Sequence, residues 1–253
     1  AFRAHDYDCL LSCTGTALAA RQKGVELLLS KHVDGMVLMG STFVEDQEAG
    51  NEYLRKAAKR IPLVLLNASY PGDNIFCVLC DDYRATMEAT QYLLDKGHQN
   101  ILYLYHNRNY SRQKKLTGYK AGLTSRGLPI RDELIRFFSE DKMSVPDVRD
   151  FIQSIAGEGI VFDAVLTSED VLSVGAAKYA RVAHRNVPEQ LAIIGYNNSN
   201  FCLCCEPELT SVDNKLETLC NQCVSTMLTV LAGQDAPQKT VFTAELITRG
   251  STR

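Results

Sequence analysis

Short runs rich in Val, Ile and Leu alternate with longer amphipathic segments along almost the whole chain. This alternation is typical of βα units, which build parallel sheets that are buried on both faces. We therefore predict strands at residues 7–13, 35–40, 62–66, 76–80, 101–105, 134–138, 163–168, 191–196 and 242–248. The periodicity of the apolar residues predicts helices between them, at residues 16–31, 46–59, 83–96, 112–126, 146–156, 170–184 and 214–232.

The alternation begins again after the polar run at residues 81–84, which indicates two α/β lobes of similar size. One lobe is predicted to comprise residues 1–80 and 214–240, and the other residues 81–213 and 241–253. Because no long linker separates them, we expect several short crossovers and a hinged cleft. Ligands of open parallel sheets bind beyond the carboxyl ends of the strands, so a site is expected in the loops at those ends.

The charge and composition of the chain argue against several kinds of partner. Its 253 residues carry a net charge of −3 without a block of Lys and Arg, so these residues alone should bind DNA poorly. No apolar run approaches the roughly 20 residues that cross a bilayer, and the N-terminus lacks a secretory pattern. Nine cysteines, an odd number, favour a reducing cytosol over a disulfide framework. We expect a cytoplasmic protein without membrane contact.

Two CxxC spacings, Cys77 to Cys80 and Cys220 to Cys223, offer the alternative of a zinc site. Residues three apart in a strand point to opposite faces, so one thiol of the first pair would point away from a shared metal. A redox role is disfavoured as well, because a thiolate is stabilised at a helix N-terminus and not within a strand. We predict no metal site and no cofactor.

Motifs of common enzymes are absent: there is no Gly-rich phosphate loop, no nucleophile elbow and no HExxH pair. His106 follows a predicted strand and is a candidate general base, with an ordinary loop histidine as the commoner alternative. Asp81 and Asp82 point in opposite directions at a strand end, so we expect one to hydrogen-bond between the lobes and the other to cap a helix. We predict no catalytic residue and no enzyme activity.

Four segments, in matching order and spacing, resemble the core of the lac repressor/galactose repressor (LacI/GalR) family. The most specific is similar to the family's order of a strand, Asn-Asp, a helix, Val-Pro and Val-Gly-Tyr/Phe-Asp-Asp. The last is similar to the family's Pro-x-Leu-Thr-Thr-Val and is followed by a terminal Leu-x-x-Arg-x-Ser-Thr pattern. The segments are CDDYRATMEATQYLLDKGHQNILYL (80–104), RQKKLTGYKAGLTSRGL (112–128), DAVLTSEDVLSVGAAKYARVAHRNVPEQLAIIGYNNS (163–199) and EPELTSVDN (206–214), with ELITRGST (245–252) at the end.

The resemblance implies the effector-binding and dimerising domain of a bacterial transcription regulator, with the two-lobed fold of type 1 periplasmic binding proteins. Such a domain binds a small effector, here expected to be a sugar or a related metabolite, in the cleft between the lobes and controls operator DNA binding allosterically as a homodimer. The family's helix-turn-helix, hinge helix and first strand have no counterpart in this sequence, so operator contact would come only from residues outside it. Exposed apolar positions on the helices at 46–59 and 214–232 are expected to support dimerisation.

By position, the resemblance also implies a set of effector-binding residues. Lys115 takes the place of the family's ligand-binding Arg, Glu169 stands where Asn is usual, and Asn197 stands where Asp is usual. The full set is Asn67, Ser111, Arg112, Lys115, Glu169, Asn197 and Asn214.

Each of these residues has a structural alternative. Arg112 and Lys115 could be solvated at a helix N-terminus, although the helix dipole disfavours cations there. Glu169 could cap a helix, as could Asp170, and Asn197 could form a turn. Because Asn offers both a donor and an acceptor without charge, the sequence leaves open a sugar, a sugar phosphate or a nucleobase as effector.

Two other functions remain open at this point. A secreted solute-binding protein of a sugar transporter would have the same two-lobed fold, although the nine cysteines and the terminal ITRGST pattern disfavour it. A small α/β enzyme would turn over a substrate.

Overall fold

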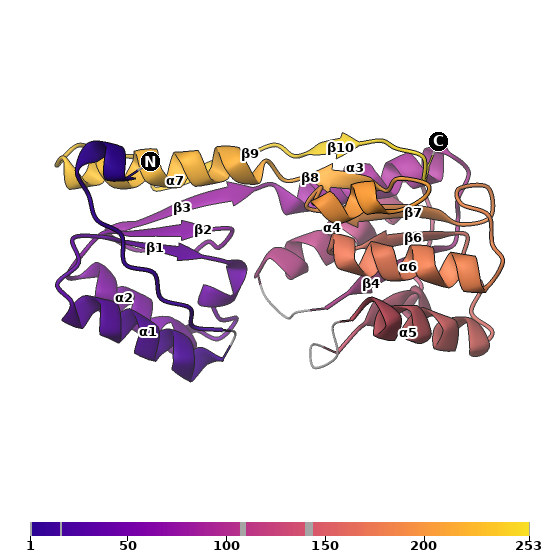
Figure 1. Ribbon diagram of the computed structural model, residues 1–253, viewed down its shortest axis with the longest axis horizontal. Coiled ribbons are helices and arrows are strands. Elements are labelled where there is room, and N and C mark those ends of the chain that lie inside the picture. The colour runs from indigo at the N-terminus through magenta and orange to yellow at the C-terminus, as the bar shows by residue number, and fades with distance from the viewer. Residues whose placement is uncertain (1, 16, 107–109, 140–143, 253) are drawn as a thin grey trace. The chain divides into compact units, whose positions relative to one another are not determined.

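The computed structural model describes residues 2–15, 17–106, 110–139 and 144–252, and the chain divides into two compact units (Figure 1). Unit 1 comprises Ala1–Cys80, Asn109–Ser111 and Leu216–Phe242. Unit 2 comprises Asp81–Arg108, Arg112–Lys215 and Thr243–Arg253. Neither unit is therefore one continuous stretch of sequence.

Unit 1 contains a parallel sheet, with strand order β1-β2-β3-β9 among the described residues. Helices α1 and α2 lie on one face of this sheet and α7 on the other (Figure 1). Its inner strand β2 is buried at every position, which explains its continuous apolar sequence LVLL. The elements are η1 (Phe2–His5), α1 (Leu18–Ser30), β1 (Met36–Met39), η2 (Ser41–Phe43), η3 (Glu48–Asn51), α2 (Glu52–Ala58), β2 (Leu63–Leu66), β3 (Ile75–Cys80), α7 (Leu216–Leu231) and β9 (Lys239–Phe242).

Unit 2 contains a longer sheet, with strand order β10-β8-β7-β6-β4-β5 among the residues described. All neighbours are parallel except β10, which pairs antiparallel with β8 at the edge. The elements are α3 (Asp82–Asp95), β4 (Ile101–Tyr105), α4 (Tyr110–Ser125, whose first residues belong to unit 1), η4 (Asp132–Leu134), β5 (Ile135–Phe137), α5 (Val145–Gly157), β6 (Ala164–Thr167), α6 (Asp170–Val182), β7 (Ala192–Tyr196), η6 (Asn200–Cys204), β8 (Thr210–Asp213) and β10 (Glu245–Ile247).

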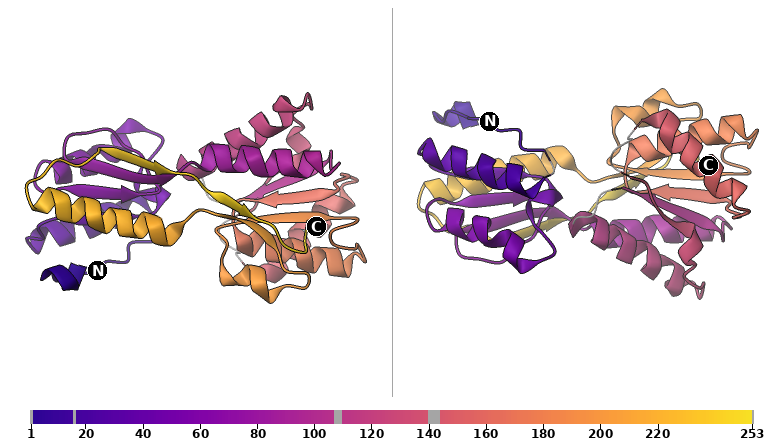
Figure 2. Two further views of the ribbon diagram at one scale, coloured as in Figure 1. Left: turned by 90° about the horizontal axis from the view of Figure 1, so that it is seen from above. Right: turned by 90° about the horizontal axis from the view of Figure 1, so that it is seen from below.

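Helices lie on both faces of the unit 2 sheet (Figure 2), and the sheet separates two apolar cores. In β4, Leu102 and Leu104 enter the core under α5 and α6, whereas Ile101 and Tyr103 enter the core under α3 and α4. This division follows from the two-residue repeat of a strand. Both faces of β4 are covered, which explains why its sequence ILYLY is apolar or aromatic at every position.

Helices α3 and α4 cross closely because α4 presents glycines to α3. A Cβ atom at Gly118 would lie 2.3 Å from the backbone oxygen of Tyr83, and one at Gly122 would lie 2.6 Å from the Cβ of Thr90. Spaced four residues apart, the two glycines lie on one face of α4. The close crossing positions the N-terminal turns of α4, which carry three of the predicted site residues, Ser111, Arg112 and Lys115.

The structure corrects the predicted elements at three places. Residues 7–13 form no strand: among the strands that the structure describes, β1 pairs with β2 and none pairs with this run, and Leu10 and Leu11 are 60% and 90% exposed. The strand predicted at 242–248 is two strands, β9 in unit 1 and β10 in unit 2. The strand β8 (Thr210–Asp213) is not among the predicted strands. Otherwise the α/β class with parallel sheets flanked by helices is confirmed.

Candidate functional site

The loops after β4, β6, β7 and β8 lie at one edge of the unit 2 sheet, which we call the carboxyl edge. Among the predicted site residues, Glu169 follows β6, Asn197 follows β7 and Asn214 follows β8. Arg112 and Lys115 lie on the first turns of α4 and contact the same edge. Asn67, which follows β2, and Ser111 belong to unit 1.

Lys115 carries a buried ammonium group at this edge, with 8% of the residue exposed. Its Nζ donates to the carbonyl oxygen of Ser168, 3.1 Å away, and lies 3.6 Å from the centroid of the Tyr196 ring. It has no carboxylate ion partner among the described residues. Since a buried cation is costly without a counter-charge, this site favours a ligand with electronegative atoms.

Arg112 and Tyr196 extend the set of charged and aromatic groups around Lys115. The guanidinium of Arg112 lies over the ring of Tyr105, at 4.5 Å from the ring centroid. The Tyr196 hydroxyl donates a 2.5 Å hydrogen bond to Oδ1 of the buried Asp82. Stacked aromatic rings and guanidinium groups hold polar ligands in a defined orientation.

His106 and Glu169 face each other across the same edge, with 3.4 Å between Nε2 of the imidazole and Oε1 of the carboxylate. Burial, and after it the charge of Lys115, lowers the pKa of His106 to about 4. The imidazole is therefore neutral near pH 7. Glu169 stands at the N-cap position of α6, but its side chain makes no capping hydrogen bond. Its carboxylate is thus directed to the His106 side of the edge.

Asn197 and Asn214 bring two amide groups together. Nδ2 of Asn214 donates to Oδ1 of Asn197 at 3.1 Å. Asn214 is 7% exposed, and its Oδ1 has no hydrogen-bond partner within the described part of the chain. The buried hydroxyl oxygen of Ser168 likewise has no partner there. Buried polar atoms without partners are rare, so both are candidates for bonding a ligand.

The buried carboxylate of Asp170, for which the sequence suggested a helix cap, connects the elements at this edge. Asp170 accepts a 2.6 Å hydrogen bond from the Ser211 hydroxyl and a 2.6 Å bond from the Ser199 amide. Gly195 leaves the necessary room, because a Cβ there would lie 2.3 Å from Oδ1 of Asp170. Asp170 therefore ties α6, β7 and β8 together. Ser168, Asp170 and Tyr196 were missed as site groups, and only their position beside predicted strand ends could have indicated them.

The cysteine pairs and the expected helix cap have ordinary surroundings. Cys77 is buried, donates to the carbonyl oxygen of Tyr70, and has a raised pKa because of its burial. Among the described residues, no group of three or more His, Cys, Asp and Glu is arranged to hold a metal ion. Asp81 caps α3 by accepting from the Arg84 amide. No helix within the described residues is long and apolar enough to span a membrane.

Comparison with known proteins finds transcription regulators that are similar to this chain. Residues 90–252 match the family model of the periplasmic binding protein-like domain. An HTH-type transcriptional regulator of Lachnoclostridium phytofermentans is 41% identical over 250 residues, which are 99% of this chain and 74% of that protein. Catabolite control protein A of Priestia megaterium is 30% identical over 187 residues, covering 73% of this chain and 54% of that protein.

Solved structures show the same fold. The transcription regulator CcpA of Lactococcus lactis has a TM-score of 0.84 at 24% identity and matches 99% of this chain and 90% of its own. A sugar-binding transcriptional regulator of the LacI family from Escherichia coli, complexed with phosphate, has a TM-score of 0.84 at 21% identity and matches 98% of this chain and 87% of its own. These relatives are regulators, and they do not favour a transporter component or an enzyme.

Proposed function

Because this chain belongs to the LacI/GalR family of transcription regulators, as an effector-binding domain, we propose that it binds a sugar or sugar derivative at the carboxyl edge of unit 2. The observation that carries the proposal is the buried ammonium of Lys115, which has no carboxylate partner among the described residues. Ser168 Oγ and Asn214 Oδ1 at the same edge also lack partners there. A polyhydroxylated or phosphorylated ligand would supply oxygens and hydroxyl groups to all three.

The neutral and charged groups have separate roles in this proposal. Asn197 and Asn214 offer amide donors and acceptors to hydroxyl groups, and Glu169 accepts from a hydroxyl. Lys115 and Arg112 bind oxygens that carry negative charge, such as those of a phosphate. Two similar regulators support this class of ligand, since one is described as a CelR–cellobiose complex and the other as sugar-binding and complexed with phosphate. Asn67 and Ser111 stay predictions as further contacts.

We propose that binding changes an equilibrium between two conformations of a cytoplasmic homodimer and so alters operator affinity. A ligand can do this only through different affinities for the two conformations, typically by about 1–3 kcal/mol. We assign no operator contact to these residues, whose net charge is −3.

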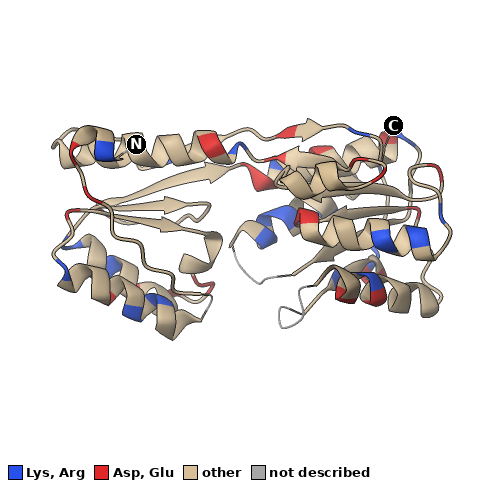
Figure 3. Ribbon diagram, viewed as in Figure 1, with Lys and Arg blue, Asp and Glu red and all other residues tan. Residues whose placement is uncertain are grey.

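The surface of unit 1 bears on dimerisation. Helix α7 carries a single charged residue, Glu217, and its Leu216 is 52% exposed (Figure 3). On α2 the apolar residues are buried and the exposed positions are charged, contrary to the expected apolar surface at 46–59. We therefore propose α7 as the helix that contributes to the dimer, and sedimentation of Leu216→Lys against the unchanged protein tests it.

Thermal-shift measurements test the ligand class. The protein is heated with D-glucose, cellobiose, glucose 6-phosphate, inorganic phosphate or adenosine. A compound at one hundred times its Kd should raise Tm by roughly 5–10 °C. Lys115→Met should remove most of that rise, whereas Lys120→Met, which makes the same charge change on α4, should keep it. Failure of every compound to shift Tm, or an undiminished shift in Lys115→Met, would contradict the proposal.

A further inference from the structure

The turn that follows β7 has an unusual backbone. Asn197 and Asn198 are consecutive residues with φ values of 98° and 48°. Residues other than glycine rarely adopt positive φ values, and Asn tolerates them better than most residues. Such a turn keeps its shape only where the surrounding groups fix it.

Three main-chain amides of this turn donate hydrogen bonds to neighbouring elements of unit 2. The amide of Asn197 donates to the Val212 carbonyl at 2.8 Å, and the amide of Asn198 donates to Ser211 Oγ at 3.0 Å. The amide of Ser199 donates to Asp170 Oδ2 at 2.6 Å. These bonds fix the path of the backbone. The side chain of Asn198 is bonded by a different element.

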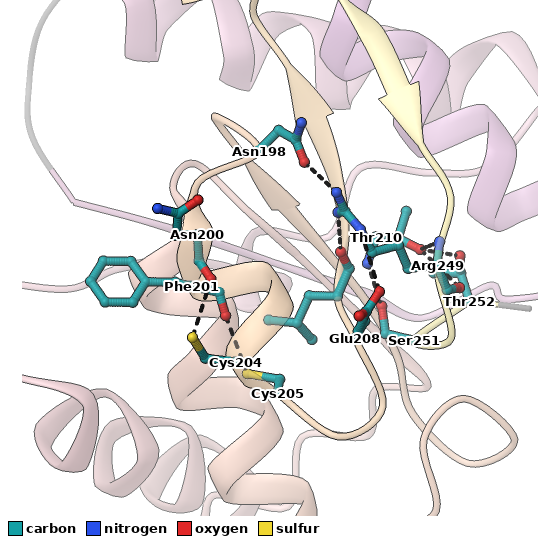
Figure 4. Close-up of polar contacts among 11 residues, drawn as sticks. Asn198, Asn200, Phe201, Cys204, Cys205, Glu208, Thr210, Arg249, Ser251 and Thr252 are labelled. Carbon is teal, nitrogen blue, oxygen red and sulfur yellow. Dashed lines mark hydrogen bonds and ion pairs between the residues drawn. The ribbon is translucent and has the colours of Figure 1, made fainter.

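That element is the C-terminal segment, which supplies Arg249. Nη2 of Arg249 donates to Oδ1 of Asn198 at 2.6 Å, while Nη1 donates to the Leu209 carbonyl at 2.7 Å (Figure 4). Nε lies 3.8 Å from Oε2 of Glu208. One planar guanidinium therefore joins the turn after β7 to the residues just before β8, a geometry that a lysine ammonium would not reproduce.

The backbone that carries the Arg249 side chain is itself held by hydrogen bonds. The Arg249 amide donates to Thr210 Oγ1 at 2.8 Å. Two residues later, Ser251 Oγ donates to the Ile193 carbonyl at 2.6 Å and accepts from the Thr210 amide at 2.8 Å. Ser251 is fully buried. The guanidinium thus starts from a backbone that is bonded to both β7 and β8, which restricts where it can place Asn198.

We propose that Arg249 is a positioning residue for effector binding: by holding Asn198, it sets the turn in which Asn197 meets Asn214. Asn198 is adjacent to Asn197, whose Oδ1 accepts from Asn214 Nδ2. Arg249 itself contacts no ligand in this proposal. The importance of the turn for ligand binding rests on the proposed function, whereas the anchoring of the turn by Arg249 does not.

Hydrogen exchange of the ligand-free protein, followed by mass spectrometry, tests the anchoring. In Arg249→Met, peptides containing residues 197–199 should exchange about tenfold faster, which is the loss expected for one charge-assisted hydrogen bond. Asn198→Leu should have the same effect, and the double variant should exceed neither single variant. Asn198→Asp keeps an acceptor and tolerates the backbone angle, so it should retain slow exchange.

Arg126→Met is the matched control, because it removes an exposed guanidinium paired with Asp95 and should leave residues 197–199 unchanged. Unchanged exchange in both Arg249→Met and Asn198→Leu would overturn the proposal, as would additive effects in the double variant.

A titration with glucose 6-phosphate separates this proposal from the proposed function. If the unchanged protein binds this compound, Arg249→Met and Asn198→Leu should raise Kd by similar factors and Asn198→Asp should raise it less. An unaltered Kd in both variants with faster exchange would overturn the role in binding. If the unchanged protein does not bind it, that result counts against a sugar phosphate as the ligand, and the exchange data alone decide whether Arg249 positions the turn.

Discussion

The two units bury different kinds of side chain. Among the buried polar residues that the structure describes, only Arg21, Asn51 and Thr226 lie in unit 1, whereas fourteen lie in unit 2. Many of those fourteen stand at or near the carboxyl edge. Burying polar groups costs free energy unless each finds a partner, so a stability-driven fold would avoid them. The contrast agrees with the proposal that unit 2 keeps polar groups for recognition, whereas unit 1 is mainly an apolar scaffold.

The largest expected effect comes from the carboxylate that supports the edge. Asp170→Ala should lower the free energy of unfolding by about 3 kcal/mol, because the Ser211 hydroxyl and the Ser199 amide lose a charged acceptor in a buried place. Asn51→Ala in unit 1, which loses two hydrogen bonds with the Glu45 backbone, should cost about 1–2 kcal/mol. Urea unfolding measures both. If Asn51→Ala lowered the free energy of unfolding more than Asp170→Ala does, the contrast between the two units would not hold.

An intermediate effect is expected from pH, through His106. Its pKa is about 4 in the folded protein against an ordinary value of 6.5, so between these values the unfolded chain takes up a proton that the folded site excludes. Stability present above pH 6.5 should therefore be lost as the pH falls toward 4, by about 2 kcal/mol. Unfolding of His106→Gln at several pH values should lack this part of the decline. An identical decline in both proteins would show that the imidazole is not held neutral.

The smallest effect compares the two buried cations. Arg21 in unit 1 is paired with Glu45, whereas Lys115 in unit 2 has no ion partner among the described residues. Arg21→Met should lower the free energy of unfolding by about 1 kcal/mol, and Lys115→Met should raise it by about 1 kcal/mol. The two changes are made in the ligand-free protein and measured by urea unfolding. If Lys115→Met destabilises as much as Arg21→Met, the ammonium serves the fold and is not reserved for a ligand.

Much of the fold could be predicted from the sequence because doubly covered strands leave long apolar runs. The family assignment and the α/β class are confirmed. β8 was missed because its sequence TSVD is short and polar, and only its neighbours β7 and β10 make it a strand. Residues 7–13 have strand-like composition, but composition alone does not supply a bonding neighbour.

The site was harder to predict, because its groups meet only after folding. Asp170 looks like a helix cap in sequence, and its role depends on Ser211, which lies 41 residues away, and on the space left by Gly195. The pKa of His106 depends on burial and on Lys115, which no local pattern predicts. The resemblance supplied candidate positions such as Asn197 and Asn214, but not the hydrogen bond that joins them.

The short stretch from Lys239 to Ile247 gives one strand to each sheet, since β9 pairs with β3 and β10 pairs with β8. Proteolytic removal of this stretch would expose unbonded backbone on both sheets at once, and such open edges readily pair with other chains. A molecule that has lost this stretch is therefore expected to aggregate through the open edge of either sheet.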